Sequence, residues 1–174
     1  MRYAHRYAYL PADPAWAQAW PQILADARTV IDAVRRAGIV IAGPDGYRRP
    51  VLDVLDGVGC NGDATTDLDA DPFTLLAPLP TSRAPVASAA CRTGRKPYDL
   101  AVTAILLRCV QLVPEVFLID SDGGWDTDWL LGPRPVPGRA ALSARELVGQ
   151  LFDPTPTASP FRDIAHFLTP GAAR

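Results

Sequence analysis

The stretch from Pro97 to Val113 constrains the fold of this chain more than any other segment. Apolar residues occupy almost every side of a helix drawn through it, and only Thr103, Arg108 and Gln111 mark a narrow polar stripe. At 17 residues it is too short to cross a bilayer comfortably, since a spanning helix needs about 20. A helix that is apolar on nearly all sides must be covered by other elements. The segment therefore predicts a central, buried helix.

Short strands are expected before and after this helix. Period-two alternation and β-branched or aromatic runs, bounded by turn residues, are typical of strands. Such strands are predicted at residues 1–10, 39–42, 50–55, 73–79, 85–91 and 116–119. We expect residues 39–42 to form a hairpin with 50–55, and residues 73–79 to form a second hairpin with 85–91.

Three further features predict helix boundaries. Asp13-Pro14 is a helix start, because an N-cap acid is followed by proline at the first helical position. Pro21 removes a backbone donor, so it should kink or restart the helix there. An amphipathic helix over residues 21–37 and a final helix over 142–152 complete the pattern. The order predicts an α+β fold: a mostly antiparallel sheet of about five to six strands, one β-α-β unit (residues 85–119) and two to three flanking helices.

Length and composition limit the class of protein. The 174 residues predict one α+β domain over residues 1–152, followed by a proline-rich tail, 153–174, that docks back on it. A net charge of −2 argues against nucleic-acid partners, and the lack of a long apolar run argues against membrane partners. Three cysteines without metal spacing and an N-terminus without a signal-like apolar run predict free thiols in the cytoplasm. The oligomeric state stays open.

A basic turn between a predicted strand end and the central helix is the first candidate site. It contains Arg92, Thr93, Arg95 and Lys96 around a glycine. Free N–H groups at a helix start favour anions, and neighbouring cations add to the attraction. The segment lacks the second glycine of a phosphate loop, so it predicts an anion or acidic-partner site without a nucleotide-binding motif. The alternative is a solvated basic turn whose arginines pair with nearby aspartates.

An acidic loop after the last predicted strand is the second candidate. Asp120, Asp122, Asp126 and Asp128 supply the hard oxygen ligands that Mg²⁺ or Ca²⁺ prefers. In a calcium-binding EF-hand loop the glycine follows the third acidic or amide ligand, whereas here the glycines follow the second acid. No glutamate follows at the end of the loop. The alternative is an aspartate-glycine turn with its acids in water. The alternating acids from Asp63 to Asp71 are a weaker metal candidate of the same kind.

The two loops are expected to meet. Both follow strands of the same β-α-β unit, and the carboxyl ends of parallel strands lie at one edge of a sheet, where ligand sites form. The predicted crevice is either a metal-assisted anion site or a rim of salt bridges. Cys91 and His5 show no sequence-adjacent catalytic partner, so both are interpreted as structural residues.

The run Cys91-Arg-Thr-Gly-Arg-Lys-Pro-Tyr-Asp-Leu100, with the later Asp-Ser-Asp-Gly-Gly-Trp125, resembles segments of a family of small bacterial and phage-encoded proteins of unknown activity. The resemblance covers about residues 91–129. It implies that the two loops belong together, and it implies no catalytic role.

The sequence thus favours a non-catalytic interaction or regulatory module that binds a protein or a small anionic ligand and needs no cofactor. The alternative is a Mg²⁺-dependent enzyme acting on a phosphate ester or nucleotide. Such chemistry consists mainly of positioning and charge neutralisation, so it would need no histidine.

Overall fold

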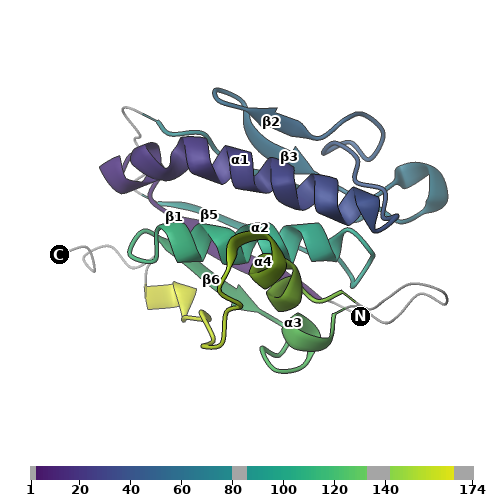
Figure 1. Cartoon of the computed structure of the whole chain (residues 1–174). Coiled ribbons are helices and arrows are strands. Elements are labelled where there is room, and N and C mark those ends of the chain that lie inside the picture. The colour runs from purple at the N-terminus through teal and green to yellow at the C-terminus, as the bar shows by residue number, and fades with distance from the viewer. Residues whose placement is uncertain (1–2, 80–85, 133–141, 167–174) are drawn as a thin grey trace.

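The computed structural model describes residues 3–79, 86–132 and 142–166 (Figure 1). The strands are β1 (His5–Tyr9), β2 (Val51–Asp53), β3 (Gly57–Cys60), β4 (Phe73–Leu75), β5 (Ala87–Cys91) and β6 (Phe117–Ser121). The helices are α1 (Pro14–Arg36), α2 (Asp99–Leu112), α3 (Asp128–Leu131) and α4 (Ala144–Phe152), with 3-10 turns η1 (Ala64–Thr66) and η2 (Ile164–His166). The α+β class is confirmed.

The strands form two separate three-stranded antiparallel sheets, in the orders β5-β1-β6 and β2-β3-β4. The expectation of one sheet of five to six strands was therefore wrong. Both predicted hairpins also differ from the structure. β2 pairs with β3, and residues 39–42 contribute only an isolated bridge between Ala42 and Asn61. β4 and β5, expected to pair, belong to different sheets.

The physical reason for this difference is the place of β1. It lies between β5 and β6 and pairs with both in antiparallel fashion, so β5 and β6 are parallel without being neighbours. The β-α-β unit therefore exists, with the N-terminal strand filling the gap that its crossover leaves. β4 then completes the small sheet around β3, whose four residues are all buried.

Helix α2 lies at the centre of the molecule, as predicted. Ten of its 14 residues are buried, and it packs against α1, α4 and β6 (Figure 1). Thr103, expected on the polar stripe, is also buried. Its hydroxyl donates to the main-chain oxygen of Asp99 at 2.7 Å, which satisfies the polar atom inside the helix.

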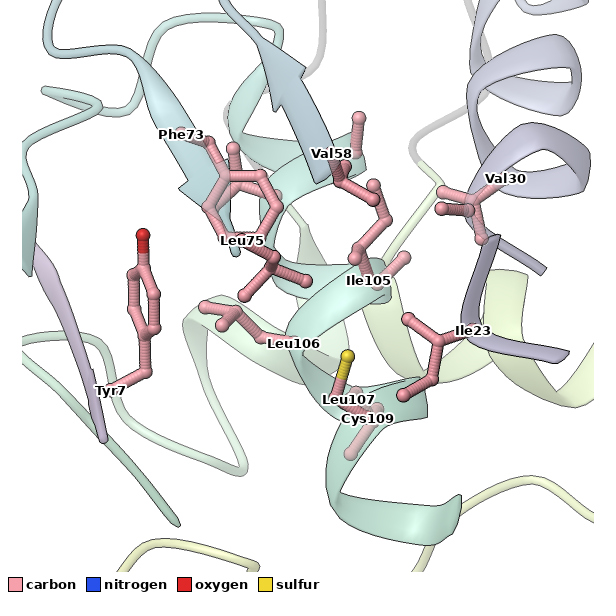
Figure 2. Packing of buried hydrophobic residues seen from close by; sticks show 14 of the residues in the cluster. Tyr7, Ile23, Val30, Val58, Phe73, Leu75, Ile105, Leu106, Leu107 and Cys109 are labelled. Carbon is pink, nitrogen blue, oxygen red and sulfur yellow. The ribbon is translucent and has the colours of Figure 1, made fainter. Parts of the chain in front are cut away.

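The core joins both sheets through α2. Figure 2 shows Ile105 and Leu106 of this helix beside Val58 and Leu75 of the second sheet, while Cys109 lies toward Ile23 of α1. Close packing of this kind makes large-to-small changes costly.

Helix α1 begins where its capping residue predicts. Asp13 accepts a hydrogen bond from Ala15 N at 2.8 Å, and α1 continues through Pro21 without a break, contrary to the expected restart. Trp16 and Trp20 before the proline and Ile23 after it are all buried, so packing on both sides compensates for the missing backbone donor. None of the helices described here is long and apolar enough to cross a membrane.

Candidate functional site

The candidate site lies at one end of the sheet β5-β1-β6. His5 at the start of β1 is in register with Cys91 at the end of β5 and with Ser121 at the end of β6. The turn that follows β5 and the loop that follows β6 therefore leave the sheet at the same edge. The predicted juxtaposition of the two loops is confirmed by this register.

The basic turn has a left-handed backbone. Gly94 and Arg95 both have positive φ, +61° and +59°, and Lys96 N donates to Thr93 O at 3.0 Å. Two successive left-handed residues closed by this bond are the pattern of a type I′ turn. Glycine adopts it readily, but a residue with a side chain in this region costs about 1–2 kcal/mol. Arg95 is therefore held in its position by contacts outside its own backbone.

Those contacts come from the N-terminus and from the acidic loop. The Arg95 guanidinium carbon lies 4.0 Å from the centroid of the Tyr3 ring, a cation–π arrangement. Its Nε donates to Asp128 Oδ1 at 2.9 Å. Burial opposes ionisation of Asp128, but the bond from Arg95 and one from Gly124 N outweigh it and lower the pKa of this carboxyl. The two predicted loops are thus joined directly by an ion pair.

The terminal nitrogens of Arg95 are differently placed. Within the described residues, neither Nη atom makes a hydrogen bond, and 38% of the side chain is exposed. The guanidinium is consequently held by Asp128 at Nε and by the Tyr3 ring against its face. Its two terminal nitrogens form a fork that is left for solvent or a ligand.

The other residues of the basic turn serve different purposes. Thr93 is fully buried, and its hydroxyl donates to Asp99 in a short hydrogen bond. Lys96 Nζ donates to the main-chain oxygens of Asp67 (2.9 Å) and Asp69, which ties the loop before β4 to the turn. Arg92 is exposed and lies 3.6 Å from an Asp71 oxygen.

Neighbouring side chains continue this anchoring. The Tyr98 hydroxyl and the Cys91 thiol both donate to Asp71 O, at 2.7 and 3.4 Å. Burial raises the pKa of the Cys91 thiol well above its ordinary value, so the thiol is kept protonated. All three cysteines, Cys60, Cys91 and Cys109, are free and buried, as expected for thiols without disulfides.

The four aspartates predicted to bind a metal are paired with three arginines, one of which is shared. Arg6 on the outer face of the sheet donates to Asp120 (2.9 Å) and to Asp122 (2.6 Å). The hydrogen bond from Arg6 to Asp122 is the main reason why the pKa of the Asp122 carboxyl is lowered. Asp126 instead pairs with Arg145 at 2.8 Å.

Asp128 pairs with Arg95, as described above, so each of the four carboxylates has an arginine partner. In the part of the chain that the structure describes, no group of three or more His, Cys, Asp or Glu side chains is placed to hold a metal ion. In the loop from Asp63 to Asp71, Asp63 caps η1 by accepting from Thr65 N at 2.9 Å.

A buried polar network beneath this edge was missed from the sequence. His5, with no exposed surface, makes one hydrogen bond from each ring nitrogen: Nδ1 to Ser121 Oγ at 2.9 Å and Nε2 to Asp99 Oδ1 at 2.7 Å. The partners are 116 and 94 residues away in sequence. Only the register of β1 brings them together, and no local motif reports it.

An open groove lies elsewhere, beside β2. It has a volume of about 290 Å³ and is lined by Pro44, Asp45, Arg48, Arg49 and Val51. Its Asp45–Arg48 pair at 2.5 Å closes a turn three residues apart. None of the predicted site residues lines this groove.

Comparison with protein-family models, with curated proteins and with solved structures finds no match to this chain.

Proposed function

We propose that this protein is an interaction or regulatory module that binds a small anionic ligand at the end of the sheet β5-β1-β6. The observation that carries the proposal is Arg95. Its guanidinium is held on the Tyr3 ring and by Asp128, while both terminal nitrogens lack a hydrogen-bond partner among the described residues. A guanidinium fork of this kind matches the paired oxygens of a carboxylate or phosphate.

Backbone strain supports the same interpretation. A left-handed arginine is uncommon, and strained residues concentrate at ligand sites, where the surrounding structure holds them in place. Here the strained residue is the exposed one, whereas Thr93 and Lys96 on either side of the turn hold the structure together. Arg92, which is exposed, adds positive charge to the same turn.

The binding test uses two anions of known geometry, inorganic phosphate and succinate, titrated into the full chain by calorimetry. We expect saturable binding that weakens with added sodium chloride, since exposed charges are screened within about 10 Å at 0.1 M salt. Arg95→Ala should weaken binding at least about tenfold. Arg36→Ala, on the exposed end of α1, is the matched control and should not change it.

A third titration with an acidic peptide distinguishes a free ligand from a carboxylate presented by a protein partner. Binding of the peptide alone, lost in Arg95→Ala, would assign the site to a partner protein. If Arg95→Ala and Arg36→Ala have the same affinity in every titration, the proposal is overturned. The alternative interpretation, a rim of salt bridges, then holds.

A further inference from the structure

Ser121, His5 and Asp99 form a hydrogen-bonded chain from three different elements. Ser121 ends β6, His5 begins β1, and Asp99 is the first residue of α2. The distances are 2.9 Å from Ser121 Oγ to His5 Nδ1 and 2.7 Å from His5 Nε2 to Asp99 Oδ1. A hydroxyl, an imidazole and a carboxylate in this order are the arrangement that activates a serine nucleophile.

The hydrogen bonds around Ser121 limit where its proton can point. Its Oγ accepts from Gly123 N at 2.9 Å and from Trp129 Nε1 at 3.1 Å. Because both donors are N–H groups, they occupy the two acceptor positions of the hydroxyl. Its own proton then has two acceptors beside it, His5 Nδ1 and the Tyr3 hydroxyl oxygen, and in the arrangement that points to His5 the other ring nitrogen, Nε2, donates to Asp99. This is the proton arrangement that a general base requires.

The imidazole is also held in place by its surroundings. The rings of Tyr3 and Trp129 contact it edge-on, with centroids 5.1 and 5.5 Å away. On the far side, Asp99 accepts a further hydrogen bond from Thr93. His5 is therefore fixed in orientation by two aromatic rings and by a carboxylate that is itself fixed. Positioning of this kind by supporting contacts is what a working nucleophile–base pair needs.

We infer that Ser121 is a nucleophile toward small carboxylic esters. Its Oγ bonds to the carbonyl carbon as the hydroxyl proton passes to His5 Nδ1, and the imidazolium is balanced by Asp99. The bond to the alcohol oxygen then breaks, and His5 returns the proton to that oxygen. Water hydrolyses the acyl-serine by the same steps in reverse order, which releases the carboxylic acid. No oxidant or metal enters this balance.

The donors on Ser121 bear directly on this reaction. Gly123 N–H and Trp129 Nε1–H both donate to Oγ itself, so they hold the hydroxyl in position and do not form an oxyanion hole, whose donors face the carbonyl oxygen of the substrate. To attack, Oγ must give up at least one of these two hydrogen bonds. The released N–H can then donate to the carbonyl oxygen. Ser121 is only half-buried, so a small electrophile is the appropriate probe.

The decisive test is covalent labelling with a small, uncharged dialkyl fluorophosphate, followed by peptide mass spectrometry. The serine–phosphorus bond forms, fluoride leaves and His5 takes the proton. We expect one adduct, at Ser121, which is absent in Ser121→Ala and unchanged in the exposed control Ser88→Ala. A folded chain that carries no adduct at Ser121 would overturn the inference.

Asp99 acts through His5 and is a positioning residue, so its test needs a readout that a purely structural role would not move. Asp99→Asn should slow labelling at least about 100-fold, and it should move the pH dependence of labelling to lower pH, because the amide does not stabilise an imidazolium. The matched control is Thr103→Val, which loses only the hydroxyl's bonds to the main-chain oxygens of Asp99 and Leu100. An Asp99→Asn profile identical to that of Thr103→Val would overturn the relay.

The substrate class rests on the proposed anion site. With Arg95 available for an anionic group, 4-nitrophenyl hydrogen succinate should be hydrolysed in preference to 4-nitrophenyl acetate, and Arg95→Ala should reduce that preference about tenfold. Labelling of Ser121 without any such preference would support the nucleophile and contradict the anion site. If Arg95→Ala loses phosphate binding and Ser121 is not labelled, the anion site is supported and the nucleophile is contradicted.

Discussion

The two ends of the sheet β5-β1-β6 are built on the same strands and differ in almost every other respect. On the core face of β1, His5 at one end is followed by Tyr7 and Tyr9 toward the other. Tyr9 lies in register with Phe117 of β6, and its ring centroid is 5.4 Å from that of Phe117. His5 instead faces a hydroxyl and a carboxylate.

The difference is one of directionality. Stacked aromatic rings stabilise through buried area, which tolerates small shifts in geometry. A buried hydrogen bond forms only when the donor lies opposite its acceptor. A buried polar group without a partner lowers stability by the free energy needed to remove it from water. The aromatic end should therefore contribute most of the stability of this sheet, while the polar end specifies which residues meet at its edge.

The largest effect is expected at the aromatic end. Phe117 is fully buried and stacks on Trp16 with the ring centroids 5.7 Å apart. Phe117→Ala should lower the free energy of unfolding by about 3–5 kcal/mol, the usual cost of a large core truncation. Urea unfolding followed by tryptophan fluorescence measures it. A loss below about 1 kcal/mol would mean that the stack does not support the sheet.

The polar end should respond strongly to the removal of its carboxylate. Asp99→Ala leaves the His5 Nε2–H and the Thr93 hydroxyl without their acceptor. We expect a loss of about 2–3 kcal/mol, as for hydrogen bonds to charged groups. Asp99→Asn retains a carbonyl acceptor and should lose less than half of that. If Asn were as damaging as Ala in the same urea titration, the charge rather than the hydrogen bonds would hold this end.

The sequence predicts some of these features and not others. The central helix and the Ser143-capped α4 were predictable, because periodicity and caps are local signals. The meeting of the loops after β5 and β6 was predictable too, since it depends only on the two strands being parallel.

The pairing of the strands was not predictable, because the insertion of β1 between β5 and β6 depends on contacts across most of the chain. The His5 network depends on that insertion. For the same reason, the sequence could identify Arg95 as a candidate but could not show that Lys96 beside it anchors a loop.

The aromatic end should lose stability in alkali. Burial raises the pKa of the Tyr9 hydroxyl from 10.0 to about 12. The folded chain then keeps a proton that the unfolded chain releases, so stability is full below pH 10 and falls as the pH rises toward 12.

The loss from Tyr9 should be about 1 kcal/mol between pH 10 and pH 11. Tyr9→Phe removes this titration but also the acceptor of Leu76 N, 2.7 Å away, so its curve should start lower and decline less steeply. Parallel curves for the two proteins in urea titrations at each pH would show that Tyr9 ionises freely when folded.

The smallest effect on stability, and the sharpest contrast with Phe117, is expected at Arg95. Its ion pair with Asp128 is partly exposed, and such pairs contribute about 0–1 kcal/mol. Arg95→Ala should therefore cost no more than about 1 kcal/mol. Arg95→Gly loses the same contacts but removes the strain of a side chain at a φ of +59°. We expect it to be more stable than Arg95→Ala by about 1 kcal/mol.

That ordering distinguishes a strained ligand site from an ordinary salt bridge. If the turn keeps its left-handed backbone in every variant, glycine recovers the strain and still fails to bind phosphate. If Arg95→Gly and Arg95→Ala unfold at the same urea concentration, the turn relaxes once the guanidinium is gone, and no strain was held there. In that case Tyr3 and Asp128 shape the turn through Arg95, and the exposed fork follows from packing alone.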